Sequence, residues 1–366
     1  MRDADAIIVG AGLSGLSLAI HLAAGGWADR RVLVIDDQRP GVAAWASWTA
    51  SPGLVDAAAT RTYRQVGIHA SGVSRVLGLG SYRYQVVRHE DLRRLALTRF
   101  GPGFAIVPGS VTSVRDEGDA AAVRLDGQTL RASWVFDSRP VPVAEPDARL
   151  AFTGWRIQCG QPAFDPALPT LFDFRTGGHG FAYVLPEDPR RALVELTEFT
   201  PSHFPLTTPD DRVTALNAYV RDVLRVAEYD VVASESAVLP LCTRAVDRGR
   251  GRVVAIGARG GLIKASTGYA FQRIQRDSAA IAQSLGRHGH PFARPRALPR
   301  HRWLDRTLLR VLDRDPAALE VAFARLFVGR SAEPVLRFLD EDTGRLDELR
   351  LIRLLPPGPY LRALRP

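Results

Sequence analysis

Residues 6–36 contain a glycine-rich turn between two apolar segments. Residues 7–9 are apolar and lead directly into Gly10, Gly12 and Gly15, in the spacing G-x-G-x-x-G. Residues 16–23 then carry apolar side chains at helical spacing, and residues 32–35 are again apolar and are followed by Asp36. This order predicts a strand, a tight turn, a helix and a second strand, which together form a nucleotide-binding unit.

Each glycine in this turn is expected for a separate physical reason. Gly10 is expected to make the tight turn, Gly12 to let the backbone approach a pyrophosphate, and Gly15 to let the helix pack on the strand. The helix N-terminus offers free N–H groups to phosphates. Asp36 comes 21 residues after Gly15, where a carboxylate can accept the ribose hydroxyls of an adenosine. The position of the unit, close to Met1, favours FAD over NAD as the cofactor.

Composition limits the remaining possibilities. A chain of 366 residues with 46% hydrophobic residues predicts two domains, or one large domain with an insertion. No apolar run is long enough to span a membrane, and the first five residues are too polar for a signal peptide, so we expect a cytoplasmic protein. The two cysteines are far apart and lack metal-type neighbours, so no metal site is expected.

The net charge of +9 comes almost wholly from arginine, because Lys264 is the single lysine. No nucleic-acid recognition motif accompanies these arginines, so we expect no nucleic acid as a partner. Basic side chains near apolar ones instead favour a membrane surface, although an ordinary solvated basic face remains an alternative.

The order of patterns along the chain predicts a nucleotide domain interrupted by an insertion. Strands are expected within residues 151–200, and a strand with a second glycine-rich turn returns at residues 253–261. The predicted parts are an FAD-binding domain at 1–140, a substrate domain at 141–245, a return segment at 246–286 and C-terminal helices at 287–366. Other expectations are an irregular segment at 41–85, a helix at 89–100, a small antiparallel unit at 104–130, and helices at 210–227 and 278–285.

The segment around Glu195 is the strongest candidate for catalysis. Side chains alternate along a strand, so Glu195 and Thr197 share one face and Glu198 lies on the other. Glu195 stands between Val194 and Leu196, and desolvation in apolar surroundings raises a carboxyl pKa, which suits a general acid. An ordinary solvated glutamate on the strand face is the alternative.

Residues 257–271 and 137–139 are the next candidates. We expect glycines and hydroxyls of the first segment to let backbone pass close to a flavin and to bond its polar ring atoms. The flavin-binding candidates there are Gly257, Gly260, Gly261, Thr267 and Gly268. Asp137, followed by Ser138 and Arg139, ends a predicted strand and is a further cofactor-binding candidate.

These segments, in this order and spacing, resemble the flavoprotein lycopene cyclases of carotenoid biosynthesis. The matching pieces are GAGLSGLSLA and VLVID near the N-terminus, the pair Trp45 and Trp48, FDSRP, GFAYVLP with ALVELTEF, GARGG with STGYAF, and FARLF with VLRFLDE near the C-terminus. The resemblance runs through nearly the whole chain.

The resemblance implies an α/β fold: a Rossmann-like FAD-binding domain of the glutathione-reductase or hydroxylase-like type, with an inserted antiparallel-sheet substrate domain and C-terminal helices. It also implies non-redox cyclisation of a linear polyene such as lycopene by FAD in its reduced form, with NAD(P)H as reductant. Glu195 matches the proton donor of the family. The expected aromatic substrate contacts are Trp45, Trp48, Phe181, Tyr183 and Tyr269, each of which is equally compatible with core packing.

One departure from the family pattern concerns Lys264. Lys264 and Ala265 stand where the family usually carries a proline, often after a histidine, just before STGY. A cation next to a carbocation is unfavourable, so we expect Lys264 to point to the flavin or to solvent. The alternatives that stay open are another polyene or terpenoid substrate, a redox flavoprotein such as a monooxygenase or dehydrogenase, and a non-catalytic flavin or prenyl-lipid carrier.

Overall fold

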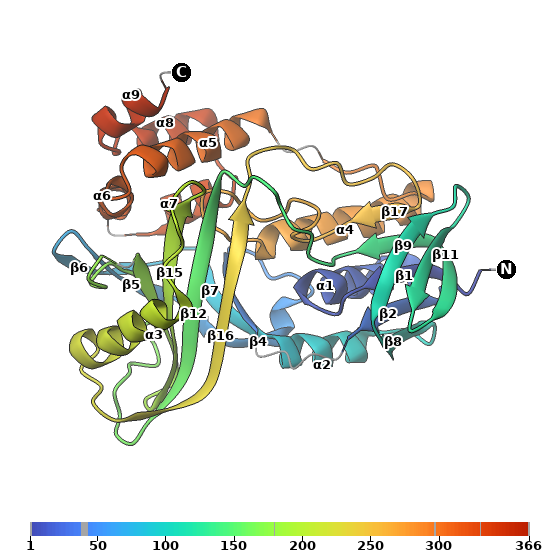
Figure 1. The fold of residues 1–366 in the computed structure, drawn as a ribbon, viewed down its shortest axis with the longest axis horizontal. Coiled ribbons are helices and arrows are strands. Elements are labelled where there is room, and N and C mark those ends of the chain that lie inside the picture. The colour runs from blue at the N-terminus through green and yellow to red at the C-terminus, as the bar shows by residue number, and fades with distance from the viewer. Residues whose placement is uncertain (1, 38–42, 179, 296–297, 330, 365–366) are drawn as a thin grey trace.

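A largely parallel sheet built around the N-terminal segment forms one half of the molecule (Figure 1, right). The computed structural model describes residues 2–37, 43–178, 180–295, 298–329 and 331–364. The strands of this sheet are, in spatial order, β8 (Phe104–Pro108), β2 (Val32–Asp36), β1 (Ala4–Val9), β11 (Gln128–Asp137), β10 (Ala121–Leu125) and β9 (Val111–Asp116), with β17 (Val253–Ala255) also pairing with β11. The carboxyl ends of β1, β2 and β11 therefore meet at one edge of the sheet.

Helices α1 (Leu13–Leu22) and α4 (Phe271–His288) lie side by side on this sheet (Figure 1). Most side chains of α1 are buried, because it lies between β1 and α4, and Gly15 permits the close approach. Helix α2 (His89–Arg99) packs on α1 through Leu92 and Ala96, which confirms the helix predicted at 89–100. Helix α4 begins earlier than the predicted 278–285 segment and ends at Gly289, which has the left-handed φ of 69°.

A second, almost wholly antiparallel sheet forms the other half of the molecule (Figure 1). Its strands are, in order, β16 (Tyr229–Leu241), β12 (Ala148–Cys159), β15 (Arg191–Pro201), β14 (Phe181–Asp188), β13 (Thr170–Asp173), β5 (Gln65–Ala70) and β6 (Val73–Gly78). Gly177 and Gly178, with φ of 67° and 91°, lie in the connection between the antiparallel strands β13 and β14, in a backbone conformation that favours glycine.

The two faces of this second sheet have different roles. Val194 and Leu196 of β15 belong to a core cluster that also contains Leu216 of α3 (Pro209–Ala218). Glu195 and Thr197 point to the opposite face, as the alternation predicts. Helix α3 is shorter than the predicted 210–227, because the chain continues as a wider π-helical turn, Tyr219–Val223.

A small third sheet lies between the halves, and it corrects the expectation that residues 41–85 are irregular. It consists of β3 (Ala44–Thr49), β7 (Arg83–Arg88) and β4 (Ala59–Tyr63), while β5 and β6 join the second sheet. Val86 packs into the core of one half and Val87 into that of the other. Because both faces of β7 are buried, its sequence lacks the alternation that identifies a half-exposed strand.

The small antiparallel unit expected at 104–130 also needs correction. β9, β10 and β11 are antiparallel neighbours, but β8 pairs in parallel with β2, because α2 crosses between them. The predicted domain limits remain a prediction. Residues 65–78 nevertheless pair within the second sheet, although they lie inside the segment assigned to the first domain.

The C-terminal region is helical and lies at one end of the second sheet (Figure 1, upper left). The helices are α5 (Pro299–Arg314), α6 (Ala318–Leu326), α7 (Glu333–Leu339), α8 (Arg345–Ile352) and α9 (Pro357–Leu364). Phe323 and Phe327 pack from here onto Phe172 of β13. Among the described residues, no helix has the length and apolar character needed to cross a bilayer.

Candidate active site

The glycine-rich turn opens into a cavity between the two halves of the molecule. Gly10 adopts a φ of 99°, and a Cβ on Gly15 would collide with the carbonyl oxygen of Gly10. Helix α1 starts immediately after Gly12, and Leu13 and Ser14 of its first turn line this cavity. Unpaired amides at a helix N-terminus can receive a phosphate group, which is the role that the sequence predicts.

Asp36 and Asp137 stand at the carboxyl ends of β2 and β11, and each contacts arginine. The Asp36 carboxylate lies 3.2 Å from Arg93 of α2. Asp137 is fully buried and accepts two hydrogen bonds from the Arg139 side chain, at 3.0 and 2.9 Å. Asp137 is absent from the cavity lining, whereas the neighbouring Ser138 is part of it. The Asp137–Arg139 pair therefore braces the strand end that holds Ser138.

The glycines of the return segment differ in what they do. Gly257 has a φ of 62°, and a Cβ there would lie 2.7 Å from Ser14 Oγ, so this turn packs directly on the start of α1. Gly260 and Gly261 lie away from the cavity and pack against the 246–256 segment instead. Of these predicted flavin contacts, the structure brings only the first glycine next to the glycine-rich turn.

Residues 267–271 form one wall of the cavity. Thr267 and Gly268 line it, and Gly268 has a φ of 75° that favours glycine. A Cβ at Gly268 would lie 2.6 Å from Leu150 Cδ1, so the loop passes close to strand β12. The cavity of about 410 Å³ thus runs from the amides of α1 past this loop to the second sheet.

Glu195 lies at the far end of this same cavity. Its walls there are Leu150, Phe152, Leu185, Leu193 and Leu239, together with tyrosine side chains. Thr197 Oγ1 donates a hydrogen bond of 3.0 Å to Glu195 Oε1. Desolvation, and then the nearby Glu235 carboxylate, raise the pKa of Glu195 to about 8. A carboxylic acid with this pKa keeps its proton at neutral pH, as the sequence predicts for a general acid.

Glu235 of β16 is a cavity residue that the sequence reasoning missed. Desolvation raises its pKa to about 7, although Arg156 and the N–H of Ala44 act in the opposite direction. Glu235 stands between two serines on a long alternating strand, a pattern typical of an exposed edge. Only the register of β16 on β12 brings it to Glu195, and no local signal reports that register.

Three tyrosine hydroxyls meet beside Glu195. Tyr269 donates to the Tyr183 hydroxyl at 3.3 Å and lies 3.4 Å from that of Tyr84. Burial, and then the neighbouring ionisable groups, raise the pKa of each phenol well above its usual value, so all three stay protonated. Two of these tyrosines were expected at the site, whereas Tyr84 was not.

The structure separates the remaining aromatic candidates. Trp45 lines the cavity, but Trp48, three residues further along β3, points to the other face and packs on Tyr269 with ring centroids 4.4 Å apart. Phe181 is 1% exposed and lies among Phe172, Phe174 and Phe323. Trp48 and Phe181 are absent from the cavity lining, whereas Trp45 belongs to it, so the structure places these two predicted substrate contacts one layer behind the cavity wall.

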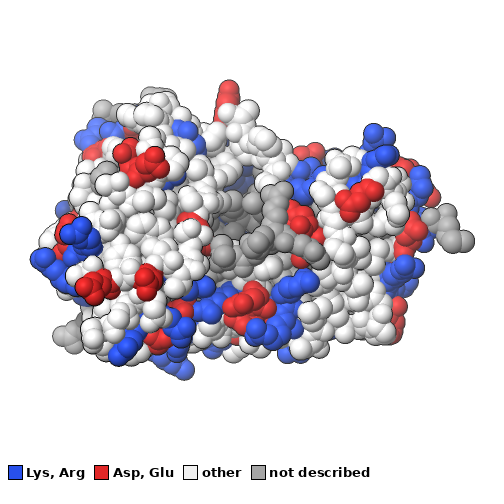
Figure 2. All heavy atoms as spheres, turned by 60° about the horizontal axis from the view of Figure 1, so that its bottom comes forward, with Lys and Arg blue, Asp and Glu red and all other residues white. Residues whose placement is uncertain are grey.

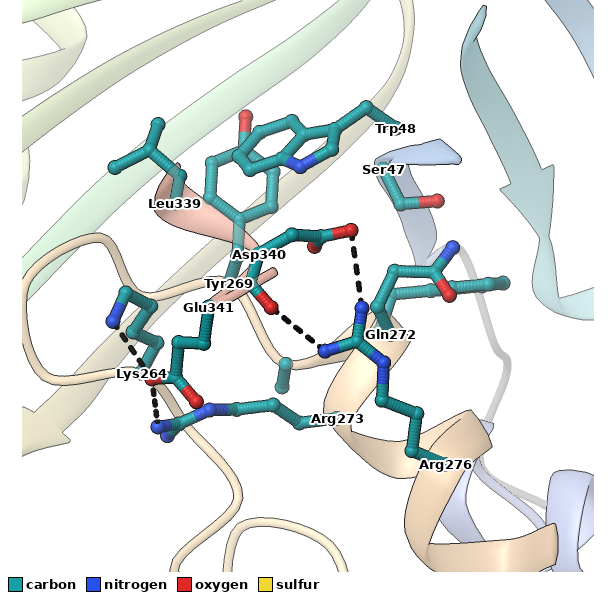
Figure 3. A pocket seen from close by; sticks show the side chains of 12 residues that line it. Ser47, Trp48, Lys264, Tyr269, Gln272, Arg273, Arg276, Leu339, Asp340 and Glu341 are labelled. Atoms are coloured by element: carbon teal, nitrogen blue, oxygen red, sulfur yellow. Dashed lines mark hydrogen bonds and ion pairs between the residues drawn. The ribbon is translucent and has the colours of Figure 1, made fainter. Parts of the chain in front are cut away.

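Lys264 corrects another expectation. Its ammonium group is 2.8 Å from Asp305 of α5 and 2.9 Å from Glu341, which follows α7, and the side chain is 9% exposed. Figure 3 shows Lys264 and Arg273 both directed at Glu341. Lys264 therefore neither faces solvent nor points into the Glu195 cavity. Two carboxylates from the C-terminal region hold it, so that it links those helices to the loop carrying Tyr269.

Charges on the outside of the molecule are mixed. On the face shown in Figure 2, basic and acidic side chains are interspersed. Among the residues that the structure describes, no group of three or more His, Cys, Asp or Glu side chains is arranged to hold a metal ion.

The family model described as lycopene cyclase protein matches residues 5–365, almost the whole chain. No curated protein matches the chain in sequence.

Several solved structures share this architecture. A geranylgeranyl bacteriochlorophyll reductase-like protein from Thermoplasma acidophilum superposes with a TM-score of 0.65 at 15% identity, covering 99% of this chain and 98% of its own. A flavoprotein/dehydrogenase from Cytophaga hutchinsonii gives 0.63 at 12% identity, with 96% and 98% covered. A variant of halogenase PltM in complex with FAD gives 0.59 at 12% identity, with 97% and 83% covered. At these identities the likeness concerns the fold, and it confirms the predicted Rossmann-like flavoprotein class.

Proposed function

Since this chain belongs to the lycopene cyclase family, we propose that it is a flavin-dependent, non-redox cyclase that closes rings at the ends of a linear carotenoid such as lycopene. The observation that carries the proposal is the position of Glu195, whose pKa is raised to about 8, in a mainly apolar cavity that Gly12 of the glycine-rich turn also lines. A redox flavoprotein does not require a carboxylic acid at this position, and neither does a carrier.

The chemistry starts with proton transfer from Glu195. Its O–H bond breaks as the terminal double bond of the end group takes the proton, and a tertiary cation forms. The neighbouring double bond attacks this cation and closes a six-membered ring, and loss of a proton then restores a double bond. Leu150, Leu185 and Leu239 exclude water, which would otherwise capture the cation. The faces of Trp45, Tyr183 and Tyr269 supply cation–π stabilisation.

The residues of the first half fit FAD. Gly12, Leu13 and Ser14 of the glycine-rich turn and helix start line the same cavity as Gly268 and Glu195. Asp36 stands at the strand end where a ribose is expected. When bound in its reduced form, FAD supplies negative charge that stabilises a cation. We propose NAD(P)H as the source of reducing equivalents.

A lipid surface is the proposed site of substrate collection, on a protein that we place in the cytoplasm. Trp303 of α5 is 53% exposed, and Leu346 and Leu349 of α8 are 72% and 51% exposed, among exposed arginines of the same helices. Such a surface attracts anionic lipid and buries apolar side chains in it. The double variant Trp303→Ser/Leu346→Ser is expected to lose co-sedimentation with anionic vesicles, whereas Val76→Ser, equally exposed on β6, should retain it.

The test of the cyclase is anaerobic incubation of the flavin-loaded protein with lycopene in liposomes and a reductant. We expect a cyclic product of unchanged mass, formed only with reduced flavin and without stoichiometric consumption of reductant. Glu195→Gln should abolish product and keep flavin bound, while the control Glu198→Gln, on the opposite face of β15, should stay active. A product that has gained oxygen or hydrogen would instead identify a redox enzyme.

A further inference from the structure

We propose that Glu235 and Glu195 form a proton-sharing carboxyl pair, in which Glu195 donates the proton and Glu235 takes up the proton that the closed ring releases. This inference rests on the proposed cyclase function. It goes beyond that function because it assigns the second half of the proton transfer to a residue on another strand.

A glycine between the two strands brings the pair together. In the sheet, β12 lies between β15 and β16, and Gly154 of β12 is the register partner of both Glu195 and Glu235. A Cβ at Gly154 would lie 3.4 Å from Glu195 Cγ and also 3.4 Å from Glu235 Cγ. The two side chains therefore converge over the space that any other residue at position 154 would occupy.

Few charges compete with this pair. Arg156, on the same face of β12, is the positive group that lowers the pKa of Glu235, but it also forms an ion pair of 2.8 Å with Glu187. The Ala44 N–H of β3 donates a hydrogen bond to Glu235, and the Thr197 hydroxyl of β15 donates one to Glu195. The tyrosines from β7, β14 and the 264–270 loop are neutral, protonated phenols. Among the described residues, the Glu235 carboxylate is therefore the one charged group that shifts the pKa of Glu195, while Arg156 is the charged group that acts on Glu235.

Two carboxyl groups in such a position cannot both ionise easily. Desolvation raises the pKa of each, and their mutual repulsion favours a state in which the pair holds one proton. That state is the one a cyclase needs at the start of a cycle, because one member must be an acid and the other a base.

The proton balance closes without an added reactant. Glu195 O–H breaks and a C–H bond forms on the end group, which leaves Glu195 as a carboxylate. After ring closure a C–H bond next to the cation breaks, its electron pair becomes the new double bond, and the proton forms an O–H bond on Glu235. Transfer of this proton from Glu235 to Glu195 resets the pair, and the product is an isomer of the substrate.

The test combines infrared titration with turnover on the flavin-loaded protein. The carboxylic-acid band of the pair should disappear between pH 6.5 and 9.5, a range in which ordinary carboxyl groups are already ionised. Glu235→Gln should lower the midpoint of the remaining carboxyl by roughly one pH unit or more, because a repelling charge is lost. It should also slow ring formation about 100-fold, the usual contribution of a general base.

Two further variants sharpen the result. Asp230→Asn removes an exposed carboxylate from the same strand and should change neither the midpoint nor the rate. Gly154→Ala inserts a methyl group between the pair, and it should lower the midpoint while both carboxyl groups remain. Wild-type protein should show a bell-shaped pH–rate profile that loses its acidic limb in Glu235→Gln.

Failure of the pair and failure of the cyclase give different results. If the wild-type protein forms rings but Glu235→Gln changes neither midpoint nor rate, the pair is refuted and the cyclase stands. If the wild-type protein forms no ring from lycopene, the uptake step falls with the proposed function. In that case the infrared titration by itself still tests whether the pair shares a proton. A titration midpoint lowered by Glu235→Gln supports sharing, and an unchanged midpoint refutes it.

Discussion

Replacing Lys264 by methionine tests whether a buried ion cluster attaches the C-terminal helices to the active-site loop. Lys264 contacts Asp305 at 2.8 Å and Glu341 at 2.9 Å, and the three side chains are only 9%, 5% and 15% exposed. Methionine keeps most of the side-chain volume but removes the charge. It leaves two carboxylates buried with less compensation, and breaking a buried pair in this way costs about 3–5 kcal/mol.

The pKa of Glu341 gives an independent value for the free energy that this ion cluster contributes to stability. Burial raises this pKa, but attraction from Lys264 and Arg273 overrides the effect and lowers it to about 2. Relative to the ordinary value of 4.5, this shift corresponds to about 3 kcal/mol of stability. A depressed carboxyl pKa contributes fully above the unfolded value and is lost as the pH falls toward the folded one. The cost of Lys264→Met should therefore shrink by roughly half between pH 7 and pH 3.

Urea unfolding followed by circular dichroism measures this cost. The matched control is Arg350→Met, which removes an i,i+3 partner of Asp347 that is 75% exposed and should cost less than about 1 kcal/mol. Neutralising both acids as well, with Asp305→Asn and Glu341→Gln, should recover part of the loss caused by Lys264→Met. A cost for Lys264→Met that equals the control, or that does not depend on pH, would refute the reasoning.

Three further predictions concern the site and its support. Because the raised pKa of Glu195 keeps its proton only below about pH 8, ring formation should decline as the pH rises through that value, which a pH–rate profile measures. Gly15→Ala should destabilise the fold by about 3 kcal/mol in urea unfolding, since its Cβ meets backbone, whereas Gly12→Ala, with open space around it, should fold normally. Tyr219→Phe removes a buried hydrogen bond of 2.8 Å to Asp173 and should cost about 1.5–3 kcal/mol in the same assay, and no loss would contradict the role assigned to that bond.

Local patterns were sufficient to predict the nucleotide-binding half. The spacing of Gly10, Gly12 and Gly15 determines backbone conformation and helix–strand contact within about thirty residues, so its meaning does not depend on the rest of the chain. The alternation around Glu195 likewise predicted which face this side chain occupies, because side-chain direction in a strand follows from the backbone alone.

Patterns failed where a segment is buried on both faces or where contacts are distant in sequence. Residues 41–85 were expected to be irregular, since β7 packs into both halves and therefore lacks alternation. Lys264 was expected to face flavin or solvent, and its partners lie 41 and 77 residues away. A sequence indicates that a charge must be compensated, but only the packing of helices decides which group compensates it.

The sequence by itself therefore determined the βαβ unit, the α/β class and the acid on an apolar strand, since each depends on interactions between near neighbours in the chain. The tertiary structure alone decided that Glu235 shares the cavity with Glu195, because the two side chains converge only where β12, lying between their strands, carries a glycine. It also decided that Trp48 and Phe181 lie behind the wall that Tyr183 and Tyr269 form. Register and packing bring distant residues together, and neither is encoded in any single segment.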